Sequence, residues 1–211
     1  MSSILGSSRV FWNLIKVMDT TTTNHGTLDP RVKRTRQMLQ CALARLLKEK
    51  EFDQISVQDI ADTATLNRAT FYDHYDDKFA LLECLVGSRF NELLEQRGVR
   101  FDGSCSSGLK STVLGVCDFL LEWQRQLEPH LELAVIAVVR RMILEGAKRH
   151  AGERAVSPEM ISSTVSWAIL GAAKEWVGTP NRCPSEEIVD TVIKLVAPIF
   201  SAESSAATLE R

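Results

Sequence analysis

Residues 56–78 of the chain read SVQDIADTATLNRATFYDHYDDK, a run whose helical period of apolar residues is interrupted once. The run opens on Ser56, and Asp59 stands three positions later, just before Ile60 and Ala61. A hydroxyl residue followed at this spacing by an acid resembles a capping box, in which each side chain bonds the main-chain N–H of the other residue. A short helix is therefore predicted over residues 57–64.

A three-residue turn, Thr65 to Asn67, follows this helix, because the apolar period stops there. Asn67 is a favourable N-cap residue, since its side-chain oxygen can accept from the free N–H groups at a helix start. Phe71 and Tyr75 are four residues apart and therefore lie on one face of a second short helix. Two helices this short bury little apolar surface alone, so longer neighbours must brace them.

Longer helices are predicted on both sides of this pair. Upstream, apolar residues recur at three-and-four spacing, which predicts a helix over residues 32–50. Downstream, Asp76 or Asp77 can cap a long amphipathic helix that ends at Gly98. The two short helices are thus held between two long ones.

The remainder of the chain is also helical in pattern. After a Gly/Ser-rich loop at residues 102–108, apolar periodicity returns in four segments. The predicted helices cover residues 109–127, 131–148, 158–178 and 184–201, and Pro198 is expected to bend or end the last one. No strand pattern competes with these helices, so the predicted fold class is all-α.

The expected domains follow from these patterns. They are a flexible N-terminal arm at residues 1–30, a three-helix helix-turn-helix domain at 31–78, a C-terminal helical domain at 79–202 and a disordered tail at 203–211.

The composition limits the class of protein. With 211 residues, of which 45% are hydrophobic, the chain can bury a substantial core. Its net charge of −2 excludes a uniformly basic coat, so any contact with nucleic acid must come from a local patch. No stretch reaches the roughly 18 apolar residues of a membrane span. Because no secretory signal is expected either, a cytoplasmic location without a membrane partner is predicted.

Two short helices joined by three residues and braced on both sides are typical of a DNA-binding helix-turn-helix. In that motif the second helix enters the major groove, while nearby helix ends and polar side chains contact phosphates. The polar or aromatic residues left outside the expected apolar core are Gln58, Arg68, Thr70, Tyr72, Asp73 and His74. Arg68 can donate twice to guanine and Asp73 can accept from cytosine, although Asp73 equally fits a solvated surface acid.

The segments SVQDIA at 56–61 and LNRATFYDHY at 66–75, with Lys78, together resemble the signature of the TetR family of transcription regulators over roughly residues 33–85. The resemblance implies phosphate contacts from Ser56, Thr70, Tyr72 and Lys78. It implies base-edge contacts from Gln58, Arg68, Ala69, Asp73 or His74. The expected partner is therefore a double-stranded DNA operator.

Two features depart from the family pattern. Thr65 occupies a turn position where the family commonly has glycine, and a β-branched residue with positive φ is strained, so a slightly remodelled turn is expected. The segment 52–78 also holds six Asp residues against two basic ones. A basic cluster at residues 31–36, which includes Arg34, is expected to compensate by contacting backbone phosphates or the adjacent minor groove.

The resemblance further implies a homodimer, more often a repressor than an activator, with a C-terminal regulatory and dimerisation domain that binds a small-molecule effector. The effector site is expected between about Leu82 and Leu144. The polar residues predicted to orient the effector are Trp123, Gln124, His130 and Arg140.

The dimer is expected to form from the last two predicted helices. Their apolar residues cover more of the helix circumference than one intramolecular face requires, and the excess favours a partner surface. The residues assigned to this interface are Trp167, Leu170, Gly171, Ile188, Val192 and Val196.

Two other classes of function were weighed against this one. The motifs GxSxG, HExxH, GxGxxG and the P-loop do not occur, so neither an enzyme nor a cofactor or metal site is expected. A metal- or redox-responsive regulator stays open as the alternative, using scattered residues among Cys105, Cys117, His130 and Cys183. Scattered cysteines are ordinarily buried packing residues.

Overall fold

A computed structural model of the chain describes residues 29–98, 105–124, 128–149 and 156–201. Within these ranges all regular structure is helical and no strand occurs, which confirms the predicted fold class. The predicted arm at 1–30, save its last two residues, and the predicted tail at 203–211 lie outside the described residues. The helices are α2 (Pro30–Leu46), η1 (Phe52–Gln54), α3 (Val57–Thr63), α4 (Arg68–Tyr72), α5 (Lys78–Gln96), α6 (Cys105–Glu122), α7 (Pro129–Arg149), α8 (Pro158–Gly178) and α9 (Ser185–Ser201).

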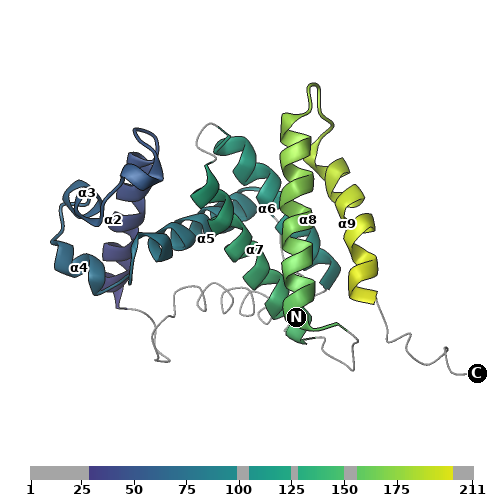
Figure 1. Ribbon diagram of the computed structural model, residues 1–211, viewed down its shortest axis with the longest axis horizontal. Helices are drawn as coiled ribbons and strands as arrows, with labels where there is room; N and C mark the ends of the chain where they lie inside the picture. The colour runs from purple at the N-terminus through teal and green to yellow at the C-terminus, as the bar shows by residue number, and fades with distance from the viewer. Residues whose placement is uncertain (1–28, 99–104, 125–127, 150–155, 202–211) are drawn as a thin grey trace, which may run out of the picture.

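The helices form two units that one long helix connects (Figure 1). Helices α2, α3 and α4 with η1 gather at one end of the molecule, and we call them the N-terminal unit. Helix α5 leaves this unit and packs against α6 and α7, so that α5–α9 form a C-terminal bundle. Helix α8 packs on α6 and α7, and α9 lies beside α8 at the far edge.

The N-terminal unit has a small apolar core beneath its two short helices. Leu43 of α2, Ile60 of α3 and Phe71 of α4 are fully buried in it. Burying side chains of this size stabilises by about 1.5–3 kcal/mol each. Helices of seven and five residues are not stable alone, so this packing holds α3 and α4 in place.

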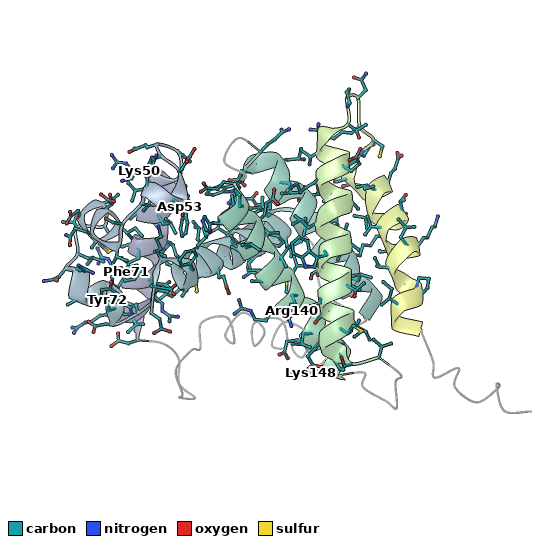
Figure 2. All side chains as sticks on the ribbon, viewed as in Figure 1. Lys50, Asp53, Phe71, Tyr72, Arg140 and Lys148 are labelled. Atoms are coloured by element: carbon teal, nitrogen blue, oxygen red, sulfur yellow. The ribbon has the colours of Figure 1, made fainter. Side chains whose placement is uncertain are left out.

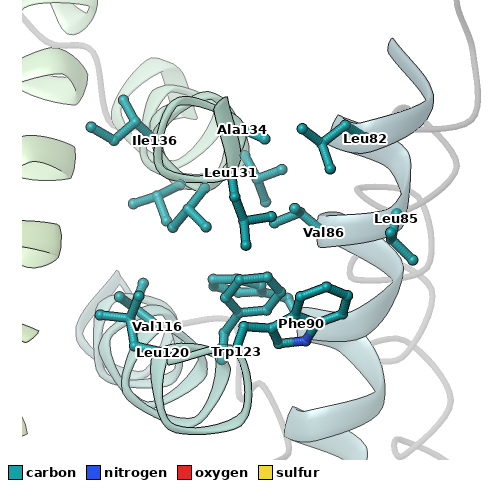
Figure 3. Close-up of a cluster of buried hydrophobic side chains, with 14 of the residues drawn as sticks. Leu82, Leu85, Val86, Phe90, Val116, Leu120, Trp123, Leu131, Ala134 and Ile136 are labelled. Carbon is teal, nitrogen blue, oxygen red and sulfur yellow. The ribbon is translucent and has the colours of Figure 1, made fainter. Parts of the chain in front are cut away.

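The C-terminal bundle has a continuous apolar core between α5, α6 and α7 (Figure 3). Val86 and Phe90 of α5 meet Leu120 of α6, Trp123 just after α6, and Leu131 of α7. None of the described helices combines the length and the apolar character that crossing a membrane requires.

Helices α5 and α6 approach each other closely at Gly115. A Cβ atom at this position would lie 3.0 Å from Cδ1 of Phe90, which is tighter than ordinary van der Waals contact. Glycine therefore suits this position, since a side chain here would require the Phe90 ring to shift within a closely packed core.

Ion pairs fix α5 to the bundle along its length. An Nη2 atom of Arg89 lies 2.8 Å from Glu122 of α6, and Nη2 of Arg141 on α7 donates to Glu83 at 2.9 Å. Helix α5 is thus part of the bundle as well as the connection to the N-terminal unit.

Most helix boundaries agree with the prediction to within a few residues, but α2 ends at Leu46 rather than at residue 50. The N–H groups of Lys48 and Glu49 bond carbonyls three residues back, and the chain then turns so that Phe52 is buried. Pro198 lies inside α9, which continues past it to Ser201.

Helix α6 begins at Cys105, inside the segment 102–108 that was expected to be a loop. The Ser111 hydroxyl donates to the carbonyl of Ser107 at 2.8 Å, so a small polar residue is accommodated by back-bonding within the helix. Glycine and serine in this stretch therefore do not mark a helix end.

Candidate nucleic-acid interface

Helix α3 starts at a complete capping box, as predicted from the sequence. The Asp59 N–H donates to Oγ of Ser56 at 3.1 Å, and the Ser56 N–H donates to Oδ2 of Asp59 at 2.8 Å. Lys50 places its Nζ 3.1 Å from the same carboxylate. The main-chain hydrogen bond from Ser56, then the Ser56 hydroxyl and Lys50, lower the pKa of Asp59 from 3.8 to about 2. The start of α3 is therefore fixed in place.

The turn between α3 and α4 places Thr65 in the left-handed region, with a φ of 57°. The Thr65 N–H donates to the Asp62 carbonyl at 3.0 Å, and the Leu66 N–H donates to the Ala61 carbonyl at 2.9 Å. This is the bonding pattern of a Schellman C-cap, whose left-handed position is usually glycine. The remodelled turn expected from the sequence does not occur, because the turn keeps its ordinary geometry and Thr65 carries the strain.

Helix α4 is held by its cap and by one buried ring. Asn67 accepts from the Ala69 N–H at 2.9 Å, as predicted. Phe71 is fully buried, and its ring meets the neighbouring ring of Tyr72 edge-on at a centroid distance of 5.4 Å. Both residues lie at the end of the molecule away from the bundle (Figure 2). One face of α4 is thus anchored while the other is presented to solvent.

The presented face of α4 carries the predicted base-reading residues Arg68, Ala69 and Asp73, all of them exposed. Nη2 of Arg68 donates to the hydroxyl of Tyr72 at 3.2 Å, and the guanidinium lies 5.6 Å from the centre of that ring. Tyr72 itself is 47% exposed. An arginine held against an aromatic ring has less side-chain freedom to lose on binding, so Arg68 is already oriented.

The other predicted contact residues occupy the same two short helices. Ser56 and Gln58 are exposed at the start of α3, and Thr70 is half-buried on α4. Nε2 of Gln58 donates to Asp62 at 2.7 Å, four residues along α3.

His74 is half-buried just beyond α4. Its main-chain carbonyl accepts from Nη2 of Arg36 at 3.4 Å, which ties α2 to this turn. Burial, and then the positive charge of Arg36, lower the pKa of the His74 imidazole against the opposing effect of Asp73. A neutral imidazole offers one donor and one acceptor, so His74 is suited to a polar contact rather than a cationic one.

Lys78, at the start of α5, is directed towards the main chain of η1. Its Nζ donates to the carbonyls of Phe52 and Ile55 at 2.9 Å each and to that of Asp53 at 3.4 Å. The ammonium also lies 4.5 Å from the centre of the Phe52 ring. A lysine ammonium has three donors, which these three carbonyls match. Lys78 is therefore a brace between α5 and η1, and its phosphate contact stays a prediction.

Arg31, Lys33 and Arg34 are exposed in the first two turns of α2. The helix begins at Pro30, and Asp29 caps it by accepting from the Arg31 N–H at 2.9 Å. Cations are unfavourable at the positive end of a helix dipole, and the first turn holds no acid to offset them. These side chains therefore do not stabilise α2, but their rigid helical setting suits them to bind an anionic partner.

The acidic character of the helix-turn-helix segment is explained by structural roles. Asp59 and Asp77 cap helices, and Oδ1 of Asp53 lies 2.9 Å from Nε2 of His130. Asp73 is exposed beside the presented face of α4. Several of these carboxylates therefore contact other groups of the fold and are not presented by α4.

The four residues expected to orient an effector do not gather at one place. Gln124 is exposed, as is Arg140 on the surface of α7 (Figure 2). His130 is half-buried at the start of α7, where its Nε2 lies 2.9 Å from Oδ1 of Asp53 in the N-terminal unit. Of the four, only Trp123 is buried, and its indole Nε1 has no hydrogen-bond partner among the described residues.

Three residues assigned to a dimer interface lie inside a single protomer. Leu170, Val192 and Val196 are at most 2% exposed, because they belong to the apolar core that α8 and α9 share with the rest of the bundle. They are already covered within one chain, so these three residues cannot supply an exposed contact surface.

The exposed faces of α8 and α9 do carry apolar residues. Trp167 is 56% exposed and Leu195 is 69% exposed, with Met160 also on the surface. Gly171 is exposed one turn beyond Trp167, and a Cβ atom there would meet nothing within 4 Å. Ile188 is half-buried.

The alternative of a metal- or redox-responsive regulator finds no site in the part of the chain that the structure describes. No three His, Cys, Asp or Glu side chains there are close enough to hold a metal ion. Burial raises the pKa of the Cys117 thiol to about 12, so it stays protonated and unreactive. The side chain of Cys105 lies outside the described residues.

Sequence reasoning missed the residues that join the N-terminal unit to the bundle. Phe52 was assigned to a short connection, yet it is fully buried and its N–H donates to Oε1 of Glu128 at 2.8 Å. The local signal was the pair of large apolar residues Phe52 and Ile55 in a short connection, which indicates buried anchors without naming their partners.

The helix-turn-helix segment is similar in sequence to bacterial regulatory proteins. Residues 42–85, from within α2 to within α5, match a family model described as bacterial regulatory proteins, tetR family. YxbF from Bacillus subtilis, described as an uncharacterized HTH-type transcriptional regulator, is 32% identical over 93 residues. That match spans 44% of this chain but only 24% of the length of YxbF.

A solved structure from Listeria innocua shares the fold over most of the chain. Lin0861 from Listeria innocua superposes with a TM-score of 0.56 and 19% identity, over 83% of this chain and 96% of that one. A TetR transcriptional regulator from Streptococcus agalactiae gives a TM-score of 0.49 and 19% identity, over 79% and 95% of the two chains. The likeness to Lin0861 extends through the bundle, so the all-helical arrangement is that of a known fold.

Proposed function

We propose that this chain is a transcription regulator of the TetR family that binds a double-stranded DNA operator through α4, because residues 42–85 match the model of that family of bacterial regulatory proteins. The observation that carries the proposal is the construction of α4. Its inner face is anchored by the buried Phe71, while Arg68, Ala69 and Asp73 stand exposed on a short helix that rigid neighbours hold out to solvent. A helix presented in this way fits the major groove.

Each exposed residue of α4 has a chemical match in that groove. The Arg68 guanidinium donates twice to O6 and N7 of guanine, and the Ala69 methyl meets the methyl group of thymine. Asp73 accepts from the amino group of cytosine. The contact between Arg68 and Tyr72 keeps the guanidinium extended along α4 before DNA arrives, which favours a specific contact.

Phosphate contacts come from the residues around α4. Arg31, Lys33 and Arg34 supply cations from the start of α2, and the exposed hydroxyl of Tyr72 supplies a neutral donor. The Ser56 hydroxyl donates to Oδ2 of Asp59 at 2.7 Å, so a phosphate contact from Ser56 requires that this bond be exchanged for one to the phosphate. Each phosphate neutralised releases counterions, so affinity falls steeply as salt rises. Arg34 is the member of the basic cluster that we assign to the phosphate backbone.

The active form is a homodimer in which α8 and α9 of two protomers pack together. The support is the pair of exposed apolar residues Trp167 and Leu195 on two neighbouring helices, with Gly171 leaving room for a close backbone approach. A two-fold dimer presents two copies of α4 to equivalent half-sites, so the operator is a near-palindrome.

A small effector acts on the bundle and releases the operator, which makes the chain a repressor. The support is Trp123, whose indole N–H is buried among apolar side chains of α5, α6 and α7 without an acceptor (Figure 3). A buried donor left unsatisfied costs about 1–3 kcal/mol, which a ligand with a hydrogen-bond acceptor recovers. An apolar molecule with one carbonyl or phenolic oxygen has this chemistry.

Selection of DNA by the purified protein tests the proposal. Duplexes with a randomised central region are incubated with the full chain at low salt, recovered by gel shift and sequenced after several rounds. We expect enrichment of one near-palindromic sequence whose half-site centres are one helical turn, about 10 base pairs, or a multiple of it apart. Recovery of no enriched sequence would contradict the proposed function.

A further inference from the structure

Gln58 and Asp62 stand four residues apart on α3 and are bonded to each other. Nε2 of Gln58 donates to Oδ1 of Asp62 at 2.7 Å, and both side chains are exposed. Residues at this spacing lie on the same face of a helix. That face points away from the core of the N-terminal unit, in which Ile60 and Ala61 are fully buried. Gln58 is among the predicted DNA contacts, whereas Asp62 is not.

The main chain that carries this pair is fixed at both ends. The capping box of Ser56 and Asp59 holds the start of α3, and the Thr65 N–H donates to the main-chain carbonyl of Asp62 at 3.0 Å. Helix α3 has only seven residues, so Gln58 lies within one turn of its start and Asp62 within one turn of its end. The separation of the two side chains therefore does not depend on the motion of a loop.

The bond determines which end of the Gln58 amide is held. A carboxylate only accepts hydrogen bonds, so Asp62 must face the NH2 group of the amide and not Oε1. One N–H is used in this way, while Oε1 and the second N–H stay free for a ligand. Without this acceptor the amide can turn about its last torsion and exchange the places of oxygen and nitrogen. Asp62 thus fixes Gln58 as one acceptor beside one donor.

One acceptor beside one donor is the complement of adenine in the major groove. The N6 amino group of adenine donates to Oε1, and N7 accepts from the free N–H. Guanine presents two acceptors, O6 and N7, so one of them would face Oε1 without a hydrogen. Cytosine presents only a donor and thymine only an acceptor, so each satisfies one of the two free groups. Adenine alone satisfies both groups of Gln58.

The charge of Asp62 also disfavours a phosphate as the partner of Gln58. A phosphate bound to the amide would lie near a carboxylate of the same sign, and the two repel each other. A base edge carries no such charge. Asp62 therefore lowers the affinity of the N-terminal unit for any duplex, and this cost indicates that its position serves selectivity.

We propose that Asp62 is a positioning residue, which fixes the Gln58 amide so that Gln58 reads one adenine in each half-site. The inference rests on the proposed function, because it requires α3 and α4 to lie against a DNA duplex. The same arrangement occurs on α4, where Arg68 donates to Tyr72 four residues later. The operator should therefore contain an adenine read from α3 in addition to the guanine read from α4.

Two variants of Gln58 test which base it reads. Their binding is measured by competition between the duplex selected by the wild-type chain and each of its single-base-pair variants. Gln58→Ala should lose a preference for adenine of about 5-fold or more at one pair in each half-site and keep its preferences elsewhere. Gln58→Glu has no N–H and accepts from the amino group of cytosine, so its preference at that pair should change from adenine to cytosine.

Asp62→Asn separates a positioning role from that of a solvated surface charge. An Asn amide can both donate and accept, so it no longer fixes the orientation of Gln58, and one negative charge is removed. We expect tighter binding to every duplex together with a loss of about 5-fold or more in the adenine preference. Asp76→Asn is the matched control, because Asp76 is an exposed acid in the turn before α5, and it should leave the adenine preference unchanged.

The free protein supplies a readout that needs no DNA. Hydrogen bonds to a carboxylate are stronger than those to a neutral amide, so the side-chain amide signals of Gln58 in NMR spectra should shift in Asp62→Asn. They should not shift in Asp76→Asn. Signals of Gln58 that stay in place in Asp62→Asn would show that Asp62 does not hold the amide, and the proposal would then be wrong.

The outcomes on DNA distinguish this inference from the proposed function. The inference is overturned if Asp62→Asn keeps the adenine preference, or if Gln58→Ala weakens binding to every duplex by the same factor. Either result is compatible with an operator that α4 reads. A wild-type chain that selects no duplex would contradict the proposed function, and reading of adenine by Gln58 would be wrong with it.

Discussion

The Lys78 ammonium lies 2.9 Å from the carbonyl oxygen of Phe52 and 4.5 Å from the centre of the same residue's ring. One lysine thus bonds both the main chain and the side chain of the residue that anchors the N-terminal unit. This arrangement gives Lys78 a structural role that a phosphate contact alone does not require.

Removal of the Lys78 charge should therefore destabilise the free protein. Lys78→Met keeps the apolar stem but leaves the η1 carbonyls without their donor, so the free energy of unfolding should fall by about 1–3 kcal/mol in urea denaturation. Lys33→Met, on the exposed start of α2, is the control and should change stability by less than about 0.5 kcal/mol. Equal stability of Lys78→Met and wild type would show that the ammonium is not a brace.

Thr65 should be replaceable by glycine with a gain in stability. A left-handed conformation costs an L-residue about 1–2 kcal/mol, and glycine gives back about 0.5–1 kcal/mol through its freer unfolded state. The net gain expected for Thr65→Gly is about 0.5–1 kcal/mol in the free energy of unfolding. Thr63→Gly, at the last residue of α3, should instead destabilise by about 0.3 kcal/mol. A loss of stability in Thr65→Gly would mean that its φ of 57° is not strained.

The capping box of α3 should show in the pH dependence of stability. Asp59 has a pKa of about 2 in the folded chain against an ordinary 3.8, so its ionised form stabilises the fold. That contribution is complete above the ordinary value and is lost as the pH falls towards about 2. The stability difference between wild type and Asp59→Asn should therefore shrink over this window, and NMR titration should find the Asp59 carboxylate still ionised near pH 3. A carboxylate that titrates at its ordinary pKa would contradict the cap.

The dimer should depend on the exposed face of α8 and α9. Trp167→Glu and Leu195→Glu each place a charge, together with its symmetry copy, in an interface that excludes water, so both should sediment as monomers at micromolar concentration. Leu133→Glu is the matched control, since Leu133 is a similarly exposed apolar residue on α7, and it should stay dimeric. If both variants still sediment with the mass of a dimer, the exposed face of α8 and α9 is not the dimer interface.

The sequence predicted features that depend on neighbouring residues. The capping box of Ser56 and Asp59 and the Asn67 cap were all read correctly, because each depends on side chains within three positions of a main-chain N–H. The exposed face of α4 was predicted in the same way, because Phe71 marks the buried face of that helix.

The features that were not predicted depend on contacts between distant residues. Trp167 and Leu170 are three positions apart and therefore only about 60° apart around α8, yet Trp167 is exposed and Leu170 is buried. Both are apolar, so the pattern does not tell where the buried face of α8 ends. The pairing of Phe52 with Glu128 joins segments 76 positions apart, and no local period encodes it.

Competition binding of wild type and Arg68→Ala to the selected duplex, and to each of its single-base-pair variants, tests the reading of DNA by α4 most directly. We expect the wild type to discriminate at one guanine-containing pair in each half-site by about 1–3 kcal/mol. Arg68→Ala should lose the preference at that pair alone and keep it at the others. If Arg68→Ala binds every duplex more weakly by the same factor, or if the wild-type chain prefers no sequence, then α4 does not read the DNA bases as proposed.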